Sequence, residues 1–125
     1  MATQAAGLIR GPLASDRRVL LLGPPGSGKS TLAGALGAAL QAAGRGCLCL
    51  GADPGTPGFG PPGAVCLGRW HDGGWQVVAL EALCSLDAGR FRLPLVDAVR
   101  RLLPPSVNGT LLIDAPGVVR GVAGA

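Results

Sequence analysis

The sequence has little of what membrane proteins and zinc proteins require. None of its apolar runs reaches the roughly 18 residues of a membrane-spanning helix. Its four cysteines, Cys47, Cys49, Cys66 and Cys84, lack the paired C-x-x-C spacing of zinc sites. No signal segment points to an oxidising compartment, so we expect buried thiols in a cytoplasmic protein without a membrane partner.

The sequence has only one lysine, and its basic charge comes almost entirely from arginine. The chain has ten arginines, seven acidic residues and a single lysine, Lys29, with a formal net charge of +4 and a pI near 9.4. A basic balance of this size suits an anionic partner such as a nucleotide or a nucleic acid, without identifying one.

The length and patterning predict one α/β domain. With 125 residues, 48% of them hydrophobic, the chain has room for a single core, and its 22 glycines and 11 prolines indicate loops between buried elements. We predict strands over 18–22, 46–50, 64–67, 75–80 and 110–113, and helices over 29–43 and 95–103. This alternation is typical of a P-loop NTPase-type, mostly parallel sheet flanked by helices, with residues 1–17 as an amino-terminal extension and 18–125 as the nucleotide-binding domain.

One motif carries the strongest chemical signal. The segment Gly23-x-x-x-x-Gly28-Lys29-Ser30 fits the phosphate-binding P-loop, and it has the required strand before it and helix after it. Its glycines let backbone N–H groups face an anion, Lys29 can reach the outer phosphates, and Ser30 offers a hydroxyl to Mg²⁺. The residues expected to bind the phosphates of a nucleoside triphosphate here are Gly23, Pro24, Pro25, Gly26, Ser27, Gly28, Lys29, Ser30 and Thr31.

A P-loop enzyme also needs an acidic residue near its metal ion. Two aspartates follow apolar strands, Asp53 after GCLCLGA and Asp114 after TLLI. Either could orient the Mg²⁺ shell, and an aspartate beside an incoming hydroxyl could act as general base. The alternative for Asp53 is a turn former in D-P-G.

The stretches GADPGTPGFGPPG and LLIDAPGVVRG make the chain similar to the polynucleotide 5′-hydroxyl kinase family, the P-loop kinases of RNA 3′-end, tRNA and ribosomal RNA processing. Asp53 falls on the second aspartate of that family's D-x-D-x-G-Q motif. Pro61 to Gly63 fall on its P-P-G, and Asp114 to Gly117 fall on its D-T-x-G.

The resemblance implies an activity and roles for these residues. Lys29 would act in catalysis and bind phosphate, and Ser30 and Asp53 would hold Mg²⁺. Asp53 would activate the 5′-hydroxyl end of a nucleic acid, either RNA or DNA, with RNA the favoured of the two. Asp114 and Gly117 would lie in the loop that covers the reacting phosphates of ATP. The chain resembles a truncated member of the family, and we expect it to be weak or inactive as a kinase alone.

Two departures leave other functions open. Gly51 stands in place of the first aspartate and Thr56 in place of the glutamine, which is compatible with an ATP-binding module or switch that phosphorylates nothing. A P-loop GTPase or a metallochaperone-like NTPase is a further alternative, although the chain shows no N/T-K-x-D motif for reading guanine.

Aromatic and basic residues elsewhere have two interpretations. Trp70 and Trp75 flank His71 and Asp72, which suggests base stacking, but a polar turn with tryptophans packed on the core is the plainer interpretation. Of the arginines, Arg90 and Arg92 are better candidates for a phosphate-backbone contact than Arg100 and Arg101, which suit the solvated side of a helix.

Overall fold

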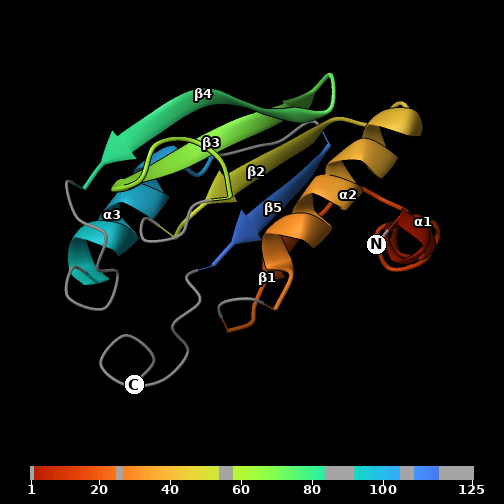
Figure 1. Ribbon diagram of the computed structural model, residues 1–125, viewed down its shortest axis with the longest axis horizontal. Helices are drawn as coiled ribbons and strands as arrows, with labels where there is room; N and C mark the ends of the chain where they lie inside the picture. The colour runs from red at the N-terminus through yellow and green to blue at the C-terminus, as the bar shows by residue number, and fades with distance from the viewer. Residues whose placement is uncertain (1, 25–26, 54–57, 84–91, 105–108, 116–125) are drawn as a thin grey trace.

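The computed structural model describes residues 2–24, 27–53, 58–83, 92–104 and 109–115 (Figure 1). In chain order the elements are α1 (Ala2–Arg10), β1 (Arg18–Leu21), α2 (Lys29–Ala42), β2 (Cys47–Gly51), β3 (Ala64–His71), β4 (Gly74–Ala82), α3 (Arg92–Leu102) and β5 (Thr110–Asp114). Within the described ranges, none of the helices has the length and apolar character that a bilayer crossing demands.

The five strands form one mixed sheet in the order β1-β5-β2-β3-β4. β5 lies between β1 and β2 and is parallel to both. β2 pairs antiparallel with β3, and β3 pairs antiparallel with β4. The expected α/β class with parallel strands at the core is therefore confirmed, and an antiparallel hairpin extends the sheet on one side.

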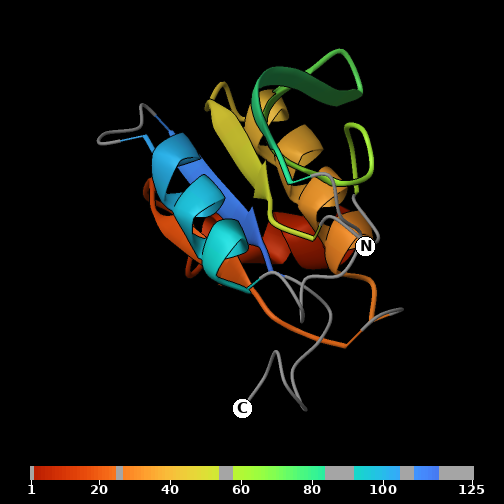
Figure 2. The ribbon, with the colours of Figure 1, turned by 90° about the vertical axis from the view of Figure 1, so that its left-hand side faces the viewer.

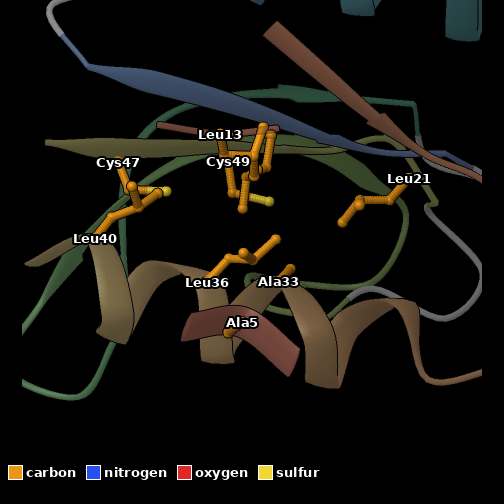
Figure 3. Packing of buried hydrophobic residues seen from close by; sticks show 9 residues of the cluster. Ala5, Leu13, Leu21, Ala33, Leu36, Leu40, Cys47 and Cys49 are labelled. Carbon is orange, nitrogen blue, oxygen red and sulfur yellow. The ribbon is translucent and has the colours of Figure 1, made fainter. Parts of the chain in front are cut away.

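Helices cover both faces of this sheet (Figures 1 and 2). Side chains along a strand alternate between the two faces, so β2 sends Cys47 and Cys49 toward one apolar cluster and Leu50 into the other. The first cluster lies between the sheet and helices α1 and α2, where Leu36 and Leu40 of α2 are buried (Figure 3). The second cluster packs α3 on the opposite face.

The hairpin and the first helix are the elements that differ most from expectation. β3 and β4 extend beyond the predicted 64–67 and 75–80, and they meet in a tight turn where Asp72 and Gly73 adopt φ values of 48° and 82°. Such paired left-handed residues are typical of two-residue hairpin turns. Helix α1 was not predicted, and it packs on α2 with Ala5 fully buried in the same core. The domain boundary at residues 17 and 18 stays a prediction.

Candidate functional site

Three loops meet at one edge of the sheet. In the strand register Leu21 of β1 and Gly51 of β2 both lie beside Asp114 of β5. Because the three strands are parallel, their carboxyl ends share an edge, which is where α/β proteins bind ligands. The P-loop follows β1, Asp53 follows β2, and Asp114 ends β5. The sheet topology thus gathers the three strongest sequence signals.

The P-loop leads into an open helix start. Gly28 precedes α2 in a left-handed conformation, with φ 88°, and no side chain caps the helix. At Gly23 a β-carbon would lie 2.5 Å from Ser27 Oγ, so any larger residue would require the Ser27 side chain to move. The first turn of α2 contains no acidic residue. Uncapped N–H groups and the helix dipole make this end suitable for an anion.

Lys29 opens α2 and is half-buried. With Ser27 and Gly28 it lines a cavity of about 360 Å³, whose other walls come from α1, β1 and Leu32. Of the described residues that line this cavity, only Lys29 is charged.

The next residue, Ser30, joins the P-loop helix to β5. Its hydroxyl donates a hydrogen bond of 2.9 Å to Asp114 Oδ2. Asp114 is only 6% exposed, and its Oδ1 has no hydrogen-bond partner within the described part of the chain. Buried polar atoms are almost always paired, so this oxygen lacks a partner that a bound cation could supply.

The loop after β2 closes against this pair. A β-carbon at Gly58 would lie 2.8 Å from Ser30 Oγ and 3.6 Å from Asp114 Oδ2. Gly58 therefore lets the loop backbone approach the hydroxyl and the carboxylate. The glycine-rich composition of residues 51–63 predicted a loop, but no local pattern indicates that this glycine contacts Ser30.

The pKa of Asp114 reflects its neighbours. Burial raises it above its ordinary value, and the negative charge of Asp53 adds to the increase. The hydrogen bond from Ser30 and the positive charge of Lys29 oppose the shift. Four predicted site residues thus interact electrostatically in one place. A cation placed between the two aspartates would relieve the cost of burying the Asp114 charge.

These groups fit a phosphate-bound Mg²⁺ better than a metal held by protein alone. No cluster of three or more His, Cys, Asp or Glu side chains gathers within the described ranges. Mg²⁺ in nucleotide sites is bound through one or two protein oxygens together with substrate phosphates and water. Ser30 Oγ and the unpartnered Asp114 Oδ1 supply that kind of donor set.

Comparison with known proteins agrees with the sequence resemblance. Residues 23–73 match the family described as mRNA cleavage and polyadenylation factor CLP1 P-loop. This range of the chain is therefore similar to the CLP1 P-loop. No curated protein matches the chain. The CLP1 match supports a P-loop nucleotide-binding protein related to polynucleotide kinases, and the suspected family resemblance is confirmed over this range. Asp114 lies beyond the matched residues.

The structure describes most of the predicted site residues. Pro25, Gly26 and Gly117 lie outside the described residues, while Pro24 and Thr31 are exposed. In this site the carboxylate that accepts the Ser30 hydrogen bond belongs to Asp114. Asp53, to which we assigned the metal, is half-buried and close enough for its charge to act on Asp114. The division of roles between the two aspartates stays a prediction.

The candidate basic track is only partly described. Arg90 and the side chain of Arg92 lie outside the described residues. Arg100 and Arg101 both pair with Asp97 on α3, and Arg101 also lies 3.6 Å from Glu81 of β4. Pairs of this kind are typical of a solvated helix face, which agrees with the plainer interpretation of these two arginines.

Proposed function

We propose that this protein is an ATP-dependent polynucleotide kinase that transfers the γ-phosphoryl group of ATP to the 5′-hydroxyl of a nucleic acid, RNA rather than DNA. The observation that carries the proposal is the hydrogen bond between Ser30 and Asp114, 84 positions apart in sequence. It brings a hydroxyl of the CLP1-type P-loop beside a buried carboxylate with an open oxygen. P-loop kinases need this combination to hold a metal–nucleotide complex.

Each residue has a defined task in this reaction. The Gly23–Ser30 loop and the start of α2 bind the phosphate chain, and Lys29 offsets negative charge on the outer phosphates. Ser30 and Asp114 would hold Mg²⁺, with Asp53 close by; when bound, the ion neutralises charge on the β- and γ-phosphates. No residue other than Lys29 provides a cation from the loop itself.

Asp53 is assigned to the acceptor. The 5′-hydroxyl oxygen forms a bond to the γ-phosphorus, the bond from that phosphorus to the β–γ bridging oxygen breaks, and ADP leaves. Asp53 orients the hydroxyl and accepts its proton. This assignment is supported by the position of Asp53 two residues after β2, near Asp114 but separate from the Ser30 hydrogen bond.

The test is phosphoryl transfer itself. The chain is incubated with Mg²⁺ and ATP labelled at the γ-phosphate, together with 5′-hydroxyl RNA or DNA oligonucleotides. We expect label at the 5′ end of RNA, less on DNA, and none on oligonucleotides that already carry a 5′-phosphate. The Asp53→Asn variant is the matched control, so even a slow rate is interpretable. Because we expect a slow rate from this chain, the comparison of the two proteins is decisive: label transfer that is equal in Asp53→Asn and wild type would contradict the proposal.

A nucleotide-binding module is the second candidate, and one observation favours it. Gly51 stands where the family has an aspartate, and a β-carbon there would lie 3.3 Å from the Phe59 ring. The space for an acidic side chain at this position is therefore filled by Phe59. Tight binding of ATP with no transfer to any oligonucleotide would favour this candidate.

A further inference from the structure

A second cavity opens directly beside the Ser30–Asp114 pair. It has a volume of about 250 Å³ and lies between α2, the end of the sheet and the β3–β4 hairpin. Ser30 and Asp114 are among its lining residues, and so are the three aromatic side chains Phe59, Trp70 and Trp75. One continuous space therefore connects the proposed reaction site with an aromatic surface.

The three aromatic side chains pack against one another in one cluster. The rings of Trp70 and Trp75 are 5.0 Å apart and nearly perpendicular, at 79°. Phe59 lies 5.8 Å from Trp75 with an interplanar angle of 34°. Trp70 is held against α2, because a β-carbon at Gly37 would lie 2.8 Å from its ring. Both tryptophans remain partly exposed, so ring surface is available to a ligand.

The cavity is nearly uncharged. Among the described residues that line it, Asp114 is the only charged side chain, and none is an arginine or a lysine. A phosphate group would meet no cation there and would face a carboxylate. The lining favours a neutral, flat, aromatic ligand. Its volume is below the roughly 300 Å³ at which pockets for drug-sized ligands begin, so it has room for about one nucleoside.

We propose that this cavity binds the 5′-terminal nucleobase of the acceptor, stacked against the cluster of Phe59, Trp70 and Trp75. The proposal rests on the proposed kinase function and names the subsite that positions its substrate. A nucleic acid with a 5′-hydroxyl end has no phosphate on the 5′ oxygen of its first nucleoside, so the base and the 5′-hydroxyl match a lining without cations among the described residues. Base stacking on aromatic side chains is tolerant of sequence. The subsite therefore selects a neutral end rather than a particular base.

The chain offers a direct optical test. It contains two tryptophans and no tyrosine, and both tryptophans line this cavity, so its tryptophan fluorescence reports on this one place. In the presence of ADP and Mg²⁺, the wild-type chain is titrated with a 5′-hydroxyl RNA oligonucleotide and with the same oligonucleotide lacking its first base. We expect quenching and tight binding by the intact end, and an affinity about 5- to 100-fold lower for the abasic end. Equal affinities would overturn the proposal.

Variants give an independent readout. Trp75→Ala should raise the oligonucleotide KM about 5- to 100-fold while the Kd for ATP stays within twofold. Trp75→Phe should restore most of the affinity, because a stacking ring remains. Val78→Ala is the matched control on the same strand; Val78 is 48% exposed and does not line the cavity. An unchanged KM in folded Trp75→Ala would overturn the proposal. Should that variant not fold, the abasic titration with wild-type protein decides.

The two proposals fail in different ways. Binding that depends on the first base, together with phosphoryl transfer that is equal in Asp53→Asn and wild type, contradicts the kinase function and supports the base subsite. Phosphoryl transfer that is equally efficient with and without the first base supports the kinase function and contradicts the subsite.

Discussion

The two flanks of helix α2 carry opposite charges. Counting the residues that the structure describes, Lys29 is the only charged one lining the cavity of about 360 Å³ on one flank, and Asp114 is the only charged one lining the cavity of about 250 Å³ on the other. Lys29 and Ser30 are consecutive in the chain, so a single step along the helix separates a cationic environment from an acidic one.

The difference shows how one helix start can serve two substrates. Consecutive residues of a helix point about 100° apart, so Lys29 and Ser30 face different sides. The cationic flank suits the polyanionic phosphates of a nucleotide, and the acidic flank suits a metal ion and a neutral hydroxyl end. If this division is correct, substitutions on the two flanks should affect different ligands. The predictions below test it, beginning with the largest expected effect.

Asp53→Asn should separate catalysis from nucleotide binding. Loss of a general base lowers kcat by about 10²- to 10⁴-fold, while the Kd for ATP should stay within several-fold because the phosphate loop is intact. Steady-state kinetics and isothermal titration with ATP and Mg²⁺ measure the two quantities. An unchanged kcat would remove Asp53 from the chemistry and leave it a turn residue.

Lys29→Ala should affect the cationic flank. Hydrogen bonds to charged groups contribute about 1.5–3 kcal/mol, so we expect the Kd for ATP to rise about 10- to 150-fold. Gln41→Ala is the control, because Gln41 lies exposed near the other end of α2. Undiminished ATP affinity in a folded Lys29→Ala protein would show that the loop does not bind phosphate through its lysine.

Substitutions at two glycines of α2 test how tightly Trp70 packs on this helix beside the cavity that Asp114 lines. A β-carbon at Gly37 would lie 2.8 Å from the Trp70 ring, whereas one at Gly34 would lie at an ordinary 3.8 Å. Overpacking costs about 1–3 kcal/mol and helix propensity returns roughly 1 kcal/mol, so Gly37→Ala should lower the free energy of unfolding by about 1–2 kcal/mol. Gly34→Ala should raise it by about 0.5–1 kcal/mol.

Urea unfolding, followed by tryptophan fluorescence and circular dichroism, compares the two alanine variants of α2. Equal effects of the two substitutions would mean that Trp70 moves freely and does not form a fixed wall.

Asp114→Asn should change the pH dependence of stability. The pKa of Asp114 is raised in the folded protein above its ordinary value of 3.8, so the folded state retains this proton where the unfolded chain releases it. The stabilisation is complete below the unfolded pKa and is lost as the pH rises through the raised folded pKa. Without nucleotide, Asp114→Asn should therefore be more stable than wild type at pH 7, and the difference should shrink near pH 4.

Thermal unfolding between pH 4 and pH 8 measures this difference. Asparagine still accepts the Ser30 hydrogen bond, so the comparison isolates the charge. In the presence of ATP and Mg²⁺ the wild type should gain more stability than the variant, because the cation requires the carboxylate. A variant less stable than wild type at pH 7 without nucleotide would contradict the prediction.

The sequence predicted those elements that local patterns determine. β1, α2 and β5 were expected because a buried apolar run, a P-loop and a run ending in aspartate are each visible within about ten residues. Helix α1 was missed because its stability depends on packing against α2, a tertiary contact rather than a local signal.

The walls of the site depend on contacts between distant residues. The position of Gly58 against Ser30, and of Trp70 against Gly37, follows from how the loop and the hairpin fold over α2. No spacing in the sequence encodes these approaches. The core-packing interpretation of Trp70 and Trp75 described part of their environment, since both pack on the α2 cluster, but it did not include the cavity that they line.

The buried thiols of β2 can report how often helix α2 separates from the sheet. Burial raises the pKa of Cys47 to about 12, although the charge of Arg45 opposes the shift. Burial also raises the pKa of Cys49, which is 1% exposed between α2 and the sheet. Thiol reagents attack the thiolate, so in the closed protein both cysteines should react extremely slowly at neutral pH. Their alkylation rates therefore measure how often α2 separates from the sheet, and nucleotide bound at the start of α2 should slow that opening.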